Sequence, residues 1–138
     1  MVDFREWLEK AYVFLEEAKD DISRERYWLA CFHAQQFAEL ALKAVLVKLV
    51  GSFPFTHSLV ELLEAIESLG YRVEEELYST AEALEKHYTM ARYPGARLVV
   101  YNRRTAIRCI EYAERIRRFV EKILEGEERG VREETKDV

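Results

Sequence analysis

The chain has 138 residues, of which 49% are hydrophobic and 12% aromatic, and its formal net charge is −5 at pH 7. This apolar content excludes an intrinsically disordered protein, and the length suits a single domain with its own core. Five Gly and two Pro are too few for the turns of a β-sandwich or barrel, and no apolar run reaches the length of a membrane span.

The first predicted helix begins after Asp3, an N-cap residue with Glu6 as its capping-box partner. Between Phe4 and Ile22 apolar residues recur at spacings of three and four, which is typical of an amphipathic helix. A short turn within residues 20–24 predicts that the next helix lies antiparallel to it.

The second predicted helix, residues 25–50, is apolar on nearly every side. A soluble helix of this kind is covered by neighbours in several directions, so we expect it to be the central helix. Gly51 suits the position after its last turn, and Pro54 marks the stop.

Three further amphipathic helices are predicted at residues 58–70, 73–91 and 102–124, the first opening with a Ser58–Glu61 capping box and the last with Asn102 as N-cap. Pro94 and Gly95 interrupt the pattern between the last two. The fold class is therefore all-α: an up-and-down bundle of about five helices in one domain, residues 1–125. Residues 126–138 have almost nothing to bury, and we expect a charged, disordered tail.

Gln35, Glu39 and Lys43 form a polar stripe on the second helix, because they occur at i, i+4 and i+8. Two interpretations stay open. The stripe is either a solvated edge of the bundle or a buried set of groups that need partners and mark a cleft or a subunit interface. His57 follows the FPF turn at the start of the third helix, where it either caps the helix or donates to a phosphate.

The remaining polar chemistry gives no metal motif. His33, His57 and His87 fall on different predicted helices without ligand spacing, and Cys31 and Cys109 lie near apolar stripes as small core residues. Two cysteines cannot make a disulfide framework and the N-terminus has no signal-peptide pattern, so we expect a cytoplasmic protein with no metal, no cofactor and no membrane contact.

Basic charge is concentrated in residues 92–118, which contain eight Arg and two Glu. Residues 1–91, in contrast, contain nine basic and 17 acidic residues. Arginine forks next to tyrosines suit phosphates and stacked bases, although a solvated charged loop would have the same composition. We expect these side chains to converge at one end of the bundle. They are Arg92, Tyr93, Arg97, Tyr101, Arg103 and Arg104.

The order and spacing of these segments resemble the HEPN family of small helical bundles over residues 4–124. Four segments carry the resemblance: ACFHAQQFAELALKAVL, THSLVELL, ARYPGA and AIRCIEYAERI. The resemblance implies a homodimer with functional residues in a cleft at the dimer interface. Many members are ribonucleases with an Arg and a His four to six residues after it, and here no His follows Arg92, Arg103 or Arg104. The chain then lacks the proton-transfer group of such cleavage.

The resemblance therefore favours a non-catalytic module that binds nucleotide or RNA phosphate or docks a nucleotidyltransferase partner, as in a toxin–antitoxin-like system. The alternative is a ribonuclease with an atypical site in which Arg92, His57 and Glu39 meet. We assign no catalytic residue. The candidate nucleotide- or RNA-binding residues are Arg92, Tyr93, His57, Glu39, Lys43, Arg103 and Arg104.

Overall fold

The computed structural model describes residues 3–94 and 99–137 of the chain. Within these residues it has helices only: α1 (Phe4–Ser23), α2 (Tyr27–Val50), α3 (Leu59–Glu67), α4 (Glu75–Glu85), α5 (His87–Met90) and α6 (Arg103–Asp137). The prediction of an all-α bundle is confirmed. The fourth predicted helix is divided at Lys86 into α4 and the single turn α5.

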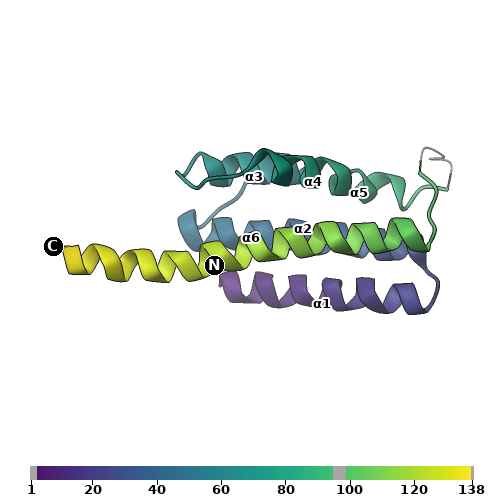
Figure 1. The fold of residues 1–138 in the computed structure, drawn as a ribbon, viewed down its shortest axis with the longest axis horizontal. Helices are drawn as coiled ribbons and strands as arrows, with labels where there is room; N and C mark the ends of the chain where they lie inside the picture. Colours follow the sequence, from purple (N-terminus) through teal and green to yellow (C-terminus); the bar gives the residue numbers. More distant parts are fainter. Residues whose placement is uncertain (1–2, 95–98, 138) are drawn as a thin grey trace.

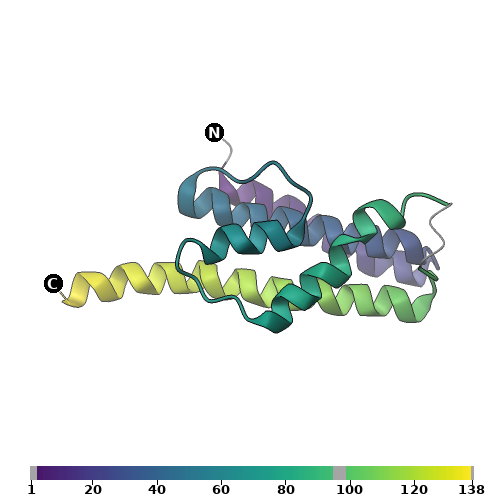
Figure 2. The ribbon, with the colours of Figure 1, turned by 90° about the horizontal axis from the view of Figure 1, so that it is seen from above.

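The long helices run along one axis of the molecule, and α2 runs antiparallel to α1 (Figure 1). The long helices α1, α2 and α6 lie side by side, and α3, α4 and α5 follow one another across them as a second layer (Figure 2). Of these, α2 contacts all five others, which confirms it as the central helix.

Capping residues begin three of the helices where the sequence places them. The Asp3 carboxylate accepts from the Arg5 amide at 2.9 Å, the Ser58 hydroxyl from the Glu61 amide at 3.2 Å, and the Asn102 side chain from the Thr105 amide at 2.9 Å. These bonds satisfy amides that a helix start leaves without an intrahelical partner. Gly51 ends α2 at φ 78°, a left-handed conformation in which glycine carries no Cβ penalty.

Small side chains let the other helices approach α2 closely. Its alanines at 30, 34, 38, 41 and 44 are buried, and Ala11 and Ala18 of α1 have no exposed surface either. Larger side chains such as Phe37, Leu42 and Ile116 fill the space between the layers. One core therefore runs the length of the bundle, with α2 at its centre.

The last helix is longer than the sequence predicts. It continues past Gly126, where we expected the bundle to end, as far as Asp137. No helix within the described residues has the length and apolar character that crossing a membrane would require.

Candidate functional site

The polar stripe of α2 is buried. Gln35, Glu39 and Lys43 keep only 0%, 5% and 8% of their surface exposed. The Lys43 ammonium donates to Glu39 Oε2 at 2.9 Å, and Gln35 Nε2 donates to Glu39 Oε1 at 3.2 Å. Of the two interpretations left open by the sequence, the solvated edge is wrong, and the stripe is a buried set of mutually paired groups.

His57 links this buried pair to the surface. Its Nδ1 lies 3.1 Å from both carboxylate oxygens of Glu39, and its backbone carbonyl accepts from Gln35 Nε2 at 3.3 Å. The Glu39 side chain is 6% exposed and the His57 side chain 55%. The histidine reaches Glu39 because the loop that follows α2 turns back over the helix before Ser58 begins α3.

Tyr88 of α5 and Arg92, which follows that helix, extend the contacts from His57. The Tyr88 hydroxyl lies 3.0 Å from His57 Nε2, and the two rings stack with centroids 4.0 Å apart. Arg92 Nε donates to the Tyr88 carbonyl at 2.6 Å, and its guanidinium lies 4.4 Å from the Tyr88 ring centroid. We call Glu39, Lys43, His57, Tyr88 and Arg92 the polar network.

The polar network brings Glu39 and Lys43 together with His57 and, through Tyr88, with Arg92. Tyr88 is the connecting residue that sequence reasoning missed. Gly95 and Arg97, which follow Arg92 in the chain, lie outside the described residues.

Beside Arg92 lies a cavity of about 730 Å³. The Arg92 guanidinium is 5.5 Å from the Tyr93 ring centroid and 5.3 Å from the Phe32 ring centroid. Trp28 was also missed by the sequence analysis; 46% of its surface is exposed, against 56% for Tyr93. The cavity is lined by Trp28, Met90, Ala91, Arg92, Tyr93, Pro94, Val99, Val100 and Tyr101.

Arg103 and Arg104 do not line this cavity. They begin α6 at the same end of the bundle (Figure 1) but border a separate hollow of about 480 Å³ with Ile107, Arg108 and Glu111. Arg92, Tyr93, Tyr101, Arg103 and Arg104 therefore lie at one end of the bundle as expected, but only the first three line the cavity beside Arg92.

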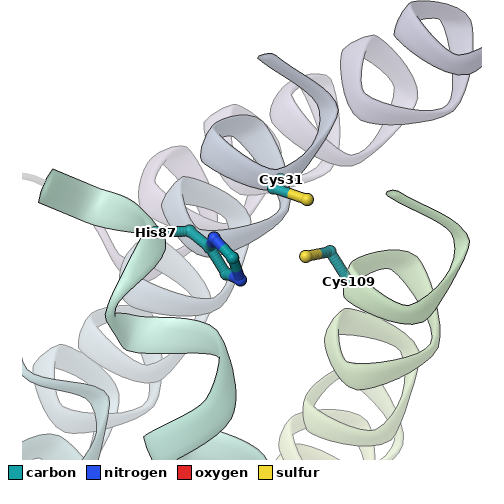
Figure 3. A group of neighbouring side chains, drawn as sticks. All are labelled: Cys31, His87 and Cys109. Carbon is teal, nitrogen blue, oxygen red and sulfur yellow. The ribbon is translucent and has the colours of Figure 1, made fainter. Parts of the chain in front are cut away.

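A second cluster joins Cys31 of α2, His87 of α5 and Cys109 of α6 (Figure 3). All three are at most 2% exposed, and the two sulfurs and a ring nitrogen lie within 4.8 Å of one another. The burial of both cysteines is confirmed. Their meeting with His87 could not be read from sequence spacing, because each residue comes from a different helix.

The contact between the two thiols shifts their pKa values in opposite directions. Cys31 and a hydrogen bond from His87 lower the pKa of Cys109 to about 6, with help from the nearby Lys86 charge. The contact with Cys109, together with burial, raises the pKa of Cys31. His87 is held in place by the Tyr101 hydroxyl, 2.6 Å from its Nδ1.

Comparison with known proteins identifies relatives of the whole bundle. The family model described as HEPN domain matches residues 4–123. Three solved structures are each 34% identical to the chain and have 98% of their own length covered. TT1696 from Thermus thermophilus aligns over 88% of the chain with a TM-score of 0.81.

The other two structures align with a TM-score of 0.72. ST0689, described as an archaeal HEPN homologue, covers 88% of the chain, and the HEPN domain protein TM0613 from Thermotoga maritima covers 87%. Among curated proteins there is no significant match.

Proposed function

The chain belongs to the HEPN domain family, and from that premise we propose that it is a non-catalytic module that binds the phosphate of a nucleotide or RNA at Arg92. The binding site consists of Arg92 and the cavity of about 730 Å³ beside it. This volume falls within the usual range of small-molecule sites, roughly 300–1,000 Å³.

The position of the Arg92 guanidinium carries the proposal. Its Nε is held by the Tyr88 carbonyl, while its terminal nitrogens have no carboxylate partner among the residues described. A guanidinium fixed through Nε and supported by an aromatic ring is arranged to receive a phosphate with its two terminal nitrogens. Little side-chain entropy is then lost on binding, because the orientation exists beforehand.

Exposed aromatic residues around Arg92 supply the second part of such a site. Trp28 and Tyr93 both line the cavity and keep about half of their surface exposed, at 46% and 56%. Base stacking on aromatic side chains contributes about 1–3 kcal/mol per base and tolerates any base. We therefore expect phosphate-dependent binding with little base preference.

A ribonuclease with an atypical site is the second candidate, and the polar network is the observation that favours it. Glu39, His57 and Arg92 belong to that network, as such an enzyme requires, and a carboxylate behind a histidine is a common arrangement for proton transfer. Yet His57 uses both ring nitrogens within the protein, one toward Glu39 and one toward the Tyr88 hydroxyl. The Tyr88 hydroxyl faces Nε2, and His57 is not among the residues that line the cavity beside Arg92, which favours the binding module.

We further propose that the chain docks a nucleotidyltransferase partner, as one member of a toxin–antitoxin-like pair. Apolar surface at the same end of the bundle supports a protein contact there: Val100 is 74% and Ile107 38% exposed. A homodimer that uses this end is part of the proposal.

Tryptophan fluorescence tests nucleotide binding directly, because the chain has only two tryptophans, Trp7 and Trp28. In the Trp7→Phe protein, a ribonucleoside triphosphate or a short single-stranded RNA should quench the Trp28 signal, and added salt should reverse the quenching. The matched control is Trp28→Phe, in which Trp7 should not respond. No quenching in low salt would refute the proposal.

Incubation of labelled RNA with the purified protein tests the second candidate. We expect the RNA to remain intact. Cleavage that persists through purification and disappears in His57→Ala would replace the binding proposal by the enzyme.

A further inference from the structure

Cys31, His87 and Cys109 bring three metal-binding side chains into one buried space between α2, α5 and α6 (Figure 3). We propose that these three residues bind a soft divalent metal ion of the Zn²⁺ class. Thiolate and imidazole are the side chains that Zn²⁺ selects, and two cysteines with one histidine make a known three-residue set for a zinc ion with an open position.

The distances already approach those of a bound ion. Zn–S bonds of roughly 2.3 Å and Zn–N bonds of roughly 2.0 Å in a tetrahedron place the donor atoms roughly 3.5–3.8 Å apart. The two sulfurs and the ring nitrogen lie within 4.8 Å of one another. Closing the cluster around an ion therefore requires side-chain shifts of about 1 Å, without a change of fold.

A hydrogen bond holds the histidine ligand in place. The Tyr101 hydroxyl lies 2.6 Å from His87 Nδ1. The Cys31 thiol contacts the Thr105 carbonyl at 3.7 Å, a contact that is given up when the thiol ionises to bind an ion. Metal-binding histidines are usually oriented by a hydrogen bond of this kind, which fixes the ring and its tautomer. The cluster thus has the support around its ligands that a metal site needs.

Charge balance also suits a divalent ion. A buried ion must be neutralised by its ligands, and two thiolates cancel a charge of two. Binding would release both thiol protons to water, leaving two metal–sulfur bonds and one metal–nitrogen bond.

Access and the fourth coordination position come from a neighbouring cavity of about 290 Å³. His87 and Cys109 form part of its wall, and Lys86, Asn102 and Arg108 are among its polar residues. A cavity of this volume admits water, which can complete a tetrahedral coordination sphere.

Cobalt provides the optical test, because Co²⁺ replaces Zn²⁺ in tetrahedral thiolate sites and gives strong visible absorption there. The full chain is reduced, treated with a chelator, freed of the chelator and titrated with Co²⁺. We expect one Co²⁺ per chain, the absorption of a thiolate-bound tetrahedral ion, and its loss when an equal amount of Zn²⁺ is added. Absence of this absorption in folded, reduced wild type, also after refolding with Co²⁺, overturns the proposal.

Variants assign the ligands. Cys109→Ser should abolish stoichiometric binding while circular dichroism confirms that the protein remains helical, and His57→Ala, outside the cluster, should bind Co²⁺ like wild type. Should Cys109→Ser not fold, Tyr101→Phe decides, with an expected loss of about 10- to 100-fold in Zn²⁺ affinity. An unchanged spectrum in folded Cys109→Ser, or a Cys31–Cys109 disulfide that forms in place of metal binding, refutes the site.

Discussion

The imidazole of His57 and the carboxylate of Glu39 form a bond between a loop and the central helix, with Nδ1 3.1 Å from each carboxylate oxygen. The same carboxylate accepts from the Lys43 ammonium at 2.9 Å. Glu39 is thus the one acidic group that both Lys43 and His57 contact among the residues described. Its charge determines whether Lys43 can stay buried and whether His57 keeps its orientation.

Glu39→Gln should lower the free energy of unfolding by about 3 kcal/mol or more, because it leaves the Lys43 ammonium buried without a counter-charge. Urea unfolding at neutral pH measures the change. The double variant Glu39→Gln/Lys43→Met should recover most of the loss, since both charges are then absent. A loss below about 1 kcal/mol in the single variant would mean that the pair behaves like an exposed one.

Arg92→Ala should weaken binding of single-stranded RNA or nucleotide by about tenfold or more, because a hydrogen bond to a charged group contributes about 1.5–3 kcal/mol. The matched control is Arg104→Ala, which removes the same charge at the same end of the bundle but from a different cavity. Its effect should be several-fold smaller. Titrations at several salt concentrations check both, and equal losses would indicate a diffuse charge effect without a site at Arg92.

The elements of this fold could be predicted because each carries its own local signals. Asp3, Ser58 and Asn102 bond the amides that N-caps are expected to bond, and Gly51 ends α2 in the left-handed conformation. The near-absence of polar surface on α2 predicted its central place. These signals act over a few residues, so one sequence suffices to read them.

Other features depend on how the helices meet, and no local pattern encodes that. The helix predicted over residues 73–91 divides at Lys86, although the sequence has neither Gly nor Pro there, and α5 begins after Lys86 as a separate helix. Two successive residues of α5 then serve different neighbours: His87 joins Cys31 and Cys109, while Tyr88 stacks on His57. Burial of the α2 polar stripe likewise required the second layer to be in place.

Addition of Zn²⁺ should raise the midpoint of thermal unfolding if Cys31, His87 and Cys109 bind it. An ion that binds only the folded state stabilises it by about 2.7 kcal/mol when its free concentration is about 100 times the dissociation constant. The comparison is between the reduced protein with Zn²⁺ and with a chelator, followed by circular dichroism. Cys109→Ser serves as control and should show no difference between the two conditions. Equal midpoints for wild type would count against the site.

Self-association should use the end of the bundle near Trp28. One chain buries most of the apolar surface of α2, and the exposed large apolar residues of this helix are Trp28 at 46% and Val50 at 52%. Light scattering at micromolar concentration should show a dimer that Trp28→Glu dissociates. Val50→Glu, at the opposite end of α2, should leave it intact. A monomeric wild type contradicts the expectation, and dissociation by Val50→Glu alone would place the interface at the other end.

Tyr12→Phe should change how stability depends on alkaline pH. Burial and the 2.7 Å hydrogen bond to Glu121 raise the pKa of Tyr12 from 10.0 to about 12. Folding therefore favours the protonated phenol, and the resulting stabilisation is complete below the unfolded pKa of 10.0 and is lost as pH rises toward 12. Over this interval the unfolded chain has lost the Tyr12 proton that the folded chain retains, so the wild type should lose about 1 kcal/mol of unfolding free energy per pH unit from this group, after allowance for partial exposure.

The Tyr12→Phe variant lacks this pH-dependent contribution. At neutral pH it should be less stable by about 1 kcal/mol, because the bond between α1 and α6 is missing. Urea unfolding of both proteins from pH 8 to pH 12 gives the comparison, and the other tyrosines cancel in the difference. Two parallel curves would show that Tyr12 ionises equally in the folded and unfolded chains.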